Sequence, residues 1–221
     1  MTVLYLFDID GTLLDAHGSG RGAFDEVFAE HHGIANASDG IRYGGKTDPA
    51  IVEEIFVARM GRVPTDAEHA AFLEAYLPRL HAQLAARVPI ILPGVVTTLE
   101  LLAKLMHVRL GVATGNVRAG AEAKLVAAGL HAWFELGGYG CDSPRRAELV
   151  AAAIERARAR YEVREVVVVG DTIHDIAAAR ACGARVCAVA TGSDPADKLQ
   201  DADAVFQTMN ELPAWHAARF G

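Results

Sequence analysis

Short apolar runs rich in β-branched residues recur along this chain of 221 residues, at 3–9, 108–114, 166–170 and 185–190. Each run is nearly continuous rather than alternating, which is typical of parallel strands covered by helices on both faces. Segments with helical periodicity lie between and after these runs, at 95–106, 119–128, 148–161 and 175–182. This alternation predicts an α/β fold with a Rossmann-like, doubly wound parallel sheet built from right-handed crossovers.

The region between the first two runs breaks the alternation. Residues 15–88 contain helical patterns but no convincing strand, and the patterns cover 23–31, 50–60 and 67–86. This segment follows the first strand, and in open α/β sheets the ligand crevice lies at the carboxyl ends of the strands. We therefore expect a core formed by residues 1–14 and 89–221, with 15–88 as a helical cap over the crevice.

Two carboxylates lie two residues apart where the first strand ends, at Asp8 and Asp10. Residues i and i+2 of an extended chain share a face, so both side chains can converge on one small site. One carboxylate can attack phosphorus while the other handles the proton of the leaving group. Gly11 permits a sharp turn, and Thr12, which is suited to hydrogen bonding in the loop, is a candidate for binding the substrate. An ordinary acidic turn is the alternative interpretation of such a pair.

The third apolar run also ends in carboxylates, at Asp171 and Asp175. Mg²⁺ prefers hard oxygen ligands in octahedral geometry and usually keeps several water molecules. The carboxylates of Asp8 and Asp171 with the main-chain carbonyl of Asp10 would suffice for such an ion. Both aspartates after the third run could instead serve as helix caps.

The second apolar run leads into Thr114, Gly115 and Asn116, just before a helical segment. Backbone N–H groups at the start of a helix, with a hydroxyl beside them, form an anion site that suits phosphate. Taken alone, a threonine or asparagine in this place is more often only a helix cap.

The segment from Asp8 to Leu13, with its DxDGT pattern followed by leucine, resembles the first motif of the haloacid dehalogenase superfamily. The order of the motifs also matches members with a helical cap, which include phosphoglycolate and sugar-phosphate phosphatases, over almost the whole chain. The resemblance implies hydrolysis of a phosphomonoester through an aspartyl-phosphate on Asp8, with Asp10 as general acid and base and Mg²⁺ as cofactor. It further implies that Asp171 binds the ion directly, that Asp175 supports it, and that Thr114 binds phosphate.

The sequence departs from the family at one element, because residues 140–149 contain no lysine where the family usually has one. Alignment of Glu148 with the acid that follows the family lysine makes Arg146 the expected cation, with Arg145 as the alternative. The planar guanidinium can bind phosphate through two hydrogen bonds, although its geometry is not that of lysine. In the cap, the resemblance suggests that Lys46 and Arg21 contact the substrate.

Three other functions share parts of this pattern of residues. A phosphomutase of the same superfamily needs the same residues together with a cap that excludes water, and this alternative stays open. A dehalogenase needs neither an acid such as Asp10 nor a magnesium cluster. This chain has residues for both, which argues against that function. A phospho-receiver module shares an acidic cluster and a doubly wound sheet, but it has no use for a lid of this size.

The composition of the chain narrows the classes of partner that we expect. The net charge is −7, and the basic residues are scattered, so neither nucleic acid nor a membrane surface is an expected partner. The three cysteines are odd in number and form no metal-binding spacing, so no disulfide framework is expected. We expect a cytoplasmic enzyme that acts on a small phosphorylated metabolite. Nothing in the sequence fixes its oligomeric state or the identity of that metabolite.

Overall fold

The computed structural model describes residues 2–221 and has a central sheet of six parallel strands. The strand order is β5-β4-β1-β6-β7-β8. The strands are β1 (Thr2–Phe7), β4 (Val108–Ala113), β5 (Leu136–Gly138), β6 (Val163–Gly170), β7 (Arg185–Val189) and β8 (Ala204–Phe206). Because β1 lies between β4 and β6, the chain winds outward from β1 in both directions. This is the predicted doubly wound sheet.

Helices cover both faces of the sheet, as the near-continuous apolar strands require. They are α4 (Val95–Ala103), α5 (Arg118–Ala127), α6 (Arg146–Arg158), α7 (Ile173–Ala181) and α8 (Leu212–Phe220). Alternate residues of β1 enter two separate hydrophobic clusters. Tyr5 and Phe7 pack with residues of α4, α5 and α8, whereas Leu4 and Leu6 pack with residues of α6 and α7.

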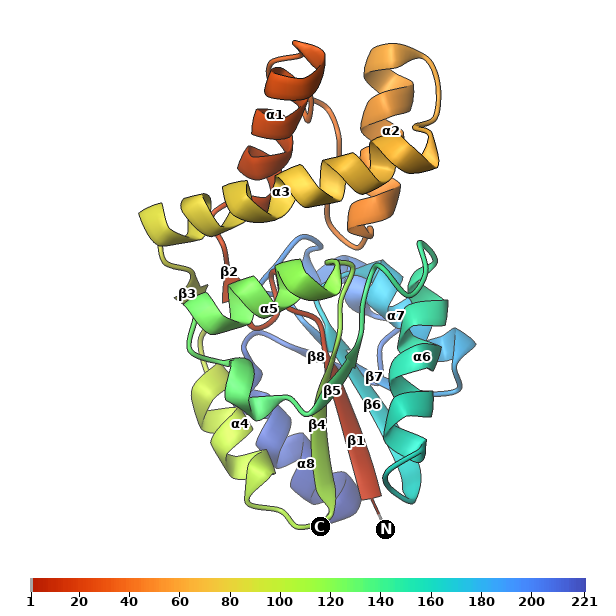
Figure 1. Cartoon of the computed structure of the whole chain (residues 1–221). Helices are drawn as coiled ribbons and strands as arrows, with labels where there is room; N and C mark the ends of the chain where they lie inside the picture. Colours follow the sequence, from red (N-terminus) through yellow and green to blue (C-terminus); the bar gives the residue numbers. More distant parts are fainter. Residues whose placement is uncertain (1) are drawn as a thin grey trace.

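The segment between β1 and β4 is helical, as predicted. It consists of α1 (Ser19–His32), α2 (Asp48–Met60) and α3 (Asp66–Ala86). These three helices lie together beyond the carboxyl ends of the strands, at the opposite end of the molecule from the C-terminus (Figure 1). Two short strands, β2 (Leu14–Asp15) and β3 (Ile90–Ile91), pair antiparallel where the chain leaves and re-enters the core.

Several elements were absent from the sequence-based prediction. The short edge strands β5 and β8, the β2–β3 pair and the C-terminal helix α8 were not expected. Strand β5 has only three residues and two of them are glycine, so its sequence carries no pattern that distinguishes it from a loop. No helix within residues 2–221 is long and apolar enough to span a membrane.

An aromatic cluster holds α1, α2 and α3 together. The ring of Phe24 is fully buried and meets Phe72 and Tyr76 edge to face, with 4.8 Å between ring centroids in both pairs. Such aromatic pairs stabilise a fold beyond the area that they bury. Phe28 joins the same cluster through Phe56 and Phe72.

We expect the Phe24→Ala variant to lower the free energy of unfolding by about 3–5 kcal/mol, because it leaves a cavity inside the helical segment. Urea unfolding followed by circular dichroism measures this loss. The control is Val57→Ala on α2, where the native side chain is 49% exposed and the change should cost less than about 1 kcal/mol. Equal stability of the two variants would contradict this account of the cluster.

Candidate active site

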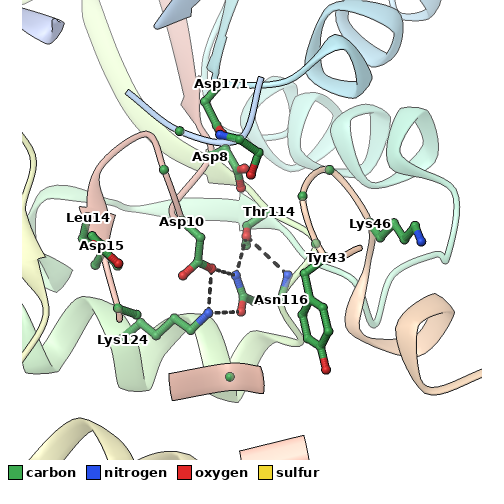
Figure 2. Close-up of a pocket in the computed structure, with 18 of the residues that line it drawn as sticks. Asp8, Asp10, Leu14, Asp15, Tyr43, Lys46, Thr114, Asn116, Lys124 and Asp171 are labelled. Atoms are coloured by element: carbon green, nitrogen blue, oxygen red, sulfur yellow. Dashed lines mark hydrogen bonds and ion pairs between the residues drawn. The ribbon is translucent and has the colours of Figure 1, made fainter. Parts of the chain in front are cut away.

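The three sequence motifs meet at the carboxyl ends of the central strands. Asp8 follows β1, Thr114 follows β4 and Asp171 follows β6, and these strands are neighbours. Their carboxyl ends therefore bring the three side chains to one place, where the strand order reverses direction. All three residues line the same cavity, which has a volume of about 360 Å³ (Figure 2).

A tight turn after β1 separates Asp8 from Asp10. Gly11 has a φ of +79°, a conformation that side-chain-bearing residues rarely adopt. A Cβ atom at this position would also lie 2.7 Å from the Asp171 carboxylate. The motif glycine is thus required both by the turn and by the neighbouring acid. Thr12 is buried and donates a hydrogen bond of 3.1 Å to Asp171, and its contact with the substrate stays a prediction.

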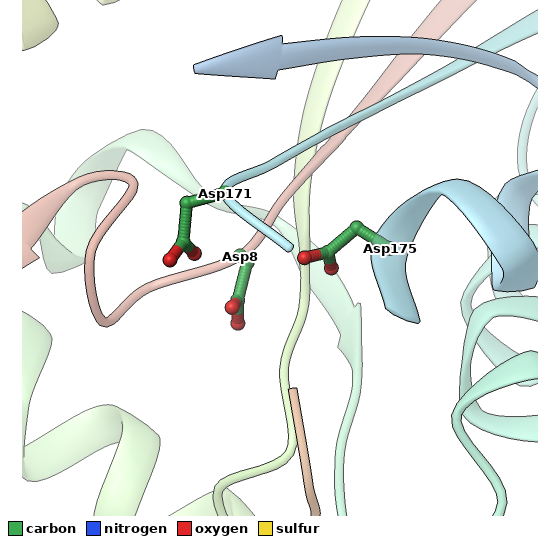
Figure 3. A group of neighbouring side chains, drawn as sticks. All are labelled: Asp8, Asp171 and Asp175. Atoms are coloured by element: carbon green, nitrogen blue, oxygen red, sulfur yellow. The ribbon is translucent and has the colours of Figure 1, made fainter. Parts of the chain in front are cut away.

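Three carboxylates form a compact buried group. One oxygen from each of Asp8, Asp171 and Asp175 lies within 4.8 Å of the others, and all three residues are buried (Figure 3). Burial raises the pKa of Asp171, and the charges of Asp8 and Asp175 raise it further. Burial also raises the pKa of Asp8, although the Arg146 guanidinium opposes the shift.

Arg146 reaches this group from the first turn of α6. Its Nη2 atom lies 2.9 Å from an oxygen of Asp8 and 2.7 Å from an oxygen of Asp175. Its Nε donates a hydrogen bond of 2.9 Å to Asp175. Arg145, the alternative cation, has an exposed side chain that pairs with Glu148. Of the two arginines, the structure therefore brings Arg146 to the candidate nucleophile.

Asp175 is engaged by its own helix as well as by the arginine. Thr172, the N-cap of α7, donates through its backbone N–H and its hydroxyl to the Asp175 carboxylate at 3.1 and 2.6 Å. Asp171 is held by Thr12 and by the backbone N–H of Ser193 at 2.6 Å. Ser193 belongs to a loop after β7 that the sequence analysis did not single out.

The donor set of this group suits a divalent cation. Three buried carboxylates face a single guanidinium, so ionisation of all three leaves uncompensated negative charge in a poorly solvated place. Carboxylate oxygens are the ligands that Mg²⁺ and related hard cations prefer. The oxygens of Asp175 accept from the Arg146 guanidinium and from Thr172, whereas within the described chain those of Asp171 accept only from the uncharged Thr12 hydroxyl and Ser193 N–H.

A second network surrounds Asp10. Lys124 of α5 places its ammonium 2.6 Å from Asp10 Oδ2 and 2.7 Å from Asn116 Oδ1. The Asn116 amide donates to Asp10 Oδ2 and to Thr114 Oγ1, both at 2.8 Å. Figure 2 shows these contacts as a closed set of hydrogen bonds. The sequence analysis predicted Asp10, Thr114 and Asn116 as site residues but missed Lys124.

The loop before α2 closes the cavity from the helical side. The Asp48 backbone N–H donates to the Gly115 carbonyl at 2.8 Å, and the Asp48 carboxylate accepts from the Val117 N–H at 2.8 Å. Burial raises the pKa of Asp48 to about 6. A Cβ atom at Gly115 would lie 2.0 Å from the Lys46 carbonyl oxygen, so this close approach requires glycine. Gly115 thus contacts the helical segment.

The cationic ends of the two predicted cap residues are engaged elsewhere. Lys46 pairs with Glu54, and its side chain points away from Asp8 and Asp10 (Figure 2). Arg21 donates to the carbonyls of Ser38 and Ile41 at 2.9 and 2.7 Å. Both residues also line the cavity, and their contact with the substrate stays a prediction.

The raised pKa values of Asp8, Asp48 and Asp171 predict how the stability of the metal-free protein depends on pH. A carboxyl group whose pKa is raised by folding binds more protons in the folded than in the unfolded state, so stability falls as the pH rises. In EDTA we expect the free energy of unfolding to fall between about pH 5 and about pH 8, and Asp171→Asn to reduce this slope. Urea unfolding at several pH values measures it.

Addition of MgCl₂ provides the second half of this test, since a ligand that binds only the folded state raises its stability. The thermal midpoint of the wild type should rise with Mg²⁺, most strongly at the higher pH, and that of Asp171→Asn should not. Equal pH slopes and equal responses to Mg²⁺ in the two proteins would refute the assignment of Asp171 to a cation site.

Comparisons with known proteins agree with this geometry. The model of the haloacid dehalogenase-like hydrolase family matches residues 3–183. A probable phosphatase, IndB of Dickeya dadantii (strain 3937), is 29% identical over 218 residues, which cover 96% of this chain and 92% of that protein.

Solved structures share the fold. CbbY from Rhodobacter sphaeroides, in complex with phosphate, has a TM-score of 0.77 at 21% identity and covers 96% of both chains. A hydrolase from Pseudomonas syringae has a TM-score of 0.71 at 23% identity and covers 100% of both chains. The predicted resemblance is confirmed, and the chain belongs to the family of haloacid dehalogenase-like hydrolases.

Proposed function

We propose that this hydrolase is a magnesium-dependent phosphatase that hydrolyses a small phosphomonoester through a phosphorylated Asp8. The observation that carries the proposal is the surroundings of the Asp8 carboxylate. It lies 2.9 Å from the buried Arg146 guanidinium and beside Asp171, in a cavity that Asp10 and Thr114 also line. A nucleophile, a cation, a metal ligand, an acid and a hydroxyl donor are thereby gathered within one cavity.

The proposed reaction has two steps. A carboxylate oxygen of Asp8 attacks phosphorus, the ester P–O bond breaks, and the departing oxygen takes a proton from Asp10. Water then attacks the phosphorus of the aspartyl-phosphate and gives its proton to Asp10. This second step releases inorganic phosphate and restores both carboxyl groups to their starting states.

Arg146 and Thr114 are suited to hold the phosphoryl group. The Nη2 atom of Arg146 is buried and makes no well-aligned hydrogen bond within the described chain, so its N–H groups can serve a phosphate oxygen. Thr114 Oγ1 accepts hydrogen bonds from the Asn116 backbone and amide, at 3.3 and 2.8 Å. Its own hydroxyl hydrogen therefore remains available for phosphate.

The ion would be held by the carboxylates of Asp8 and Asp171 and by the main-chain carbonyl of Asp10. Bound Mg²⁺ would neutralise negative charge on the transferring phosphoryl group. Asp175 would support the site by orienting Arg146, with which it forms its closest ion pair.

The size of the cavity supports a small substrate. A volume of about 360 Å³ lies near the lower end of the range for small-molecule sites, about 300–1,000 Å³. A phosphorylated hydroxy acid such as phosphoglycolate, or a small sugar phosphate, is the class that we favour. A screen of phosphorylated metabolites with release of inorganic phosphate as the readout, in MgCl₂ and in EDTA, tests this proposal directly.

We expect Asp8→Asn to abolish turnover of p-nitrophenyl phosphate in MgCl₂, because the amide cannot form the acyl-phosphate. Its thermal midpoint should stay close to that of the wild type. Asp10→Asn should keep the nucleophile but slow hydrolysis of alkyl phosphates by about 100-fold to 10,000-fold. Substantial hydrolysis by a folded Asp8→Asn protein would rule out the phosphorylated intermediate.

Arg146→Ala should lower kcat/KM by about 100-fold or more, on the scale of losing one preorganised donor to the transition state. Arg146→Lys should recover only part of this loss, because an ammonium cannot contact Asp8 and Asp175 in the same way. The matched control is Arg145→Ala, which removes an exposed neighbouring charge and should retain nearly all activity. If the two alanine variants were equally active, another cation would have to serve the phosphoryl group.

A further inference from the structure

Lys124 is a buried cation in the site that no motif of the sequence pointed to. Its side chain is 6% exposed, although it lines the cavity from α5. Burying an ammonium is costly unless anionic or polar partners compensate. Its partners are Asp10 and Asn116, at 2.6 and 2.7 Å.

The contacts of Lys124 treat the two oxygens of Asp10 differently. Oδ2 receives hydrogen bonds from Lys124 and from the Asn116 amide. No donor within residues 2–221 reaches Oδ1. The Asp10 side chain is 42% exposed, so packing alone leaves it free to rotate. The ammonium and the amide therefore fix one oxygen and leave the other for exchange of a proton.

We propose that Lys124 is a positioning residue for Asp10, which it holds so that Oδ1 faces the departing ester oxygen. The inference rests on the proposed phosphatase function, in which the ester P–O bond breaks and the proton on Asp10 passes to the leaving oxygen. Proton transfer needs the acid within hydrogen-bond reach and correctly oriented. A freely rotating carboxyl group would meet that requirement only part of the time.

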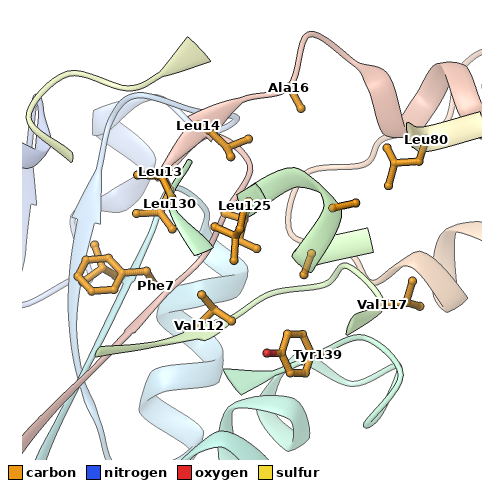
Figure 4. Packing of buried hydrophobic residues seen from close by; sticks show 14 of the residues in the cluster. Phe7, Leu13, Leu14, Ala16, Leu80, Val112, Val117, Leu125, Leu130 and Tyr139 are labelled. Carbon is orange, nitrogen blue, oxygen red and sulfur yellow. The ribbon is translucent and has the colours of Figure 1, made fainter. Parts of the chain in front are cut away.

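Helix α5, which carries Lys124, is packed against the sheet. Val117, the N-cap residue of α5, and Leu125 within the helix belong to the cluster that contains Phe7 and Val112 of the sheet (Figure 4). Long side chains on a helix lean toward its N-terminus. The ammonium of Lys124 can therefore return to Asn116, which precedes the helix by two residues.

The identity of the leaving group separates positioning of the acid from other roles. An alkoxide must be protonated as it departs, whereas p-nitrophenolate is a weak base that leaves with little assistance. We therefore compare kcat/KM, which reports phosphoryl transfer to Asp8, for p-nitrophenyl, phenyl and ethyl phosphate. Lys124→Met should lose about 100-fold with ethyl phosphate, the lower range of general acid catalysis, but less than about fivefold with p-nitrophenyl phosphate.

Two further variants make the result specific. In an Asp10→Asn background, Lys124→Met should cost little more with ethyl phosphate, because the acid that it positions is already gone. Lys104→Met removes an exposed lysine on the core and serves as the matched control, with unchanged kinetics expected for all three esters. If Lys124→Met fails to fold in a thermal melt, Lys124→Gln keeps a hydrogen-bonding group and is carried through the same series.

The outcomes are distinct. A loss that grows with the basicity of the leaving group supports positioning of Asp10. An equal loss for all three esters, or full additivity with Asp10→Asn, would assign Lys124 to phosphate binding or stability and overturn the proposal. Absence of any turnover by the wild type on esters of every kind would remove the phosphatase function itself, and with it this role.

Discussion

Compensation of negative charge at the carboxyl edge of the sheet is the constraint on which this site depends. The carboxylates of Asp8, Asp171 and Asp175 lie within 4.8 Å of one another in a buried place. Arg146 provides one positive charge among them, and its planar group can face two carboxylates at once. An ammonium is a point charge with three rotatable donors, so it would contact the two carboxylates without the fixed planar geometry of the guanidinium. The negative charge that remains is what makes the group suitable for a divalent ion.

The two carboxylates of the first motif are given different environments and different cations. Asp8 is buried and lies beside Arg146, whereas Asp10 is 42% exposed and is bound by Lys124. A pair of acids with contrasting surroundings can divide two tasks between them. The buried carboxylate is suited to attack phosphorus. The half-exposed carboxylate is suited to exchange protons with a leaving group and with water.

Sequence reasoning found what is encoded locally. The i, i+2 spacing of Asp8 and Asp10, the runs that form β1, β4 and β6, and the aspartates after β6 are all properties of short segments. Arg146 could be expected from its place before Glu148 in a resembling motif, and its burial beside Asp8 agrees with that expectation.

Features that depend on packing between distant segments could not be predicted from the sequence. Lys124 is one lysine in an ordinary amphipathic helix, and only the placement of α5 against the sheet directs its ammonium to Asp10. Packing also decides the partner of Lys46, which was expected to contact the substrate. Its ammonium pairs with Glu54 on the helix that follows, and the contact with substrate stays a prediction. A short strand such as β5 can be recognised only from its pairing with a neighbouring strand of the sheet.

The loop that carries the proposed phosphate-binding residues also contacts the helical segment, so the two parts of the cavity are physically linked. Gly115 accepts a hydrogen bond from the Asp48 backbone, and its Cα approaches the Lys46 carbonyl too closely for any side chain. Thr114 and Asn116, on either side of this glycine, take part in the network that reaches Asp10. A shift of the helical segment would therefore disturb the phosphate loop, and through Asn116 also the carboxyl group that exchanges protons. In the proposed mechanism, the cavity is therefore complete only when the helical segment is seated on the core.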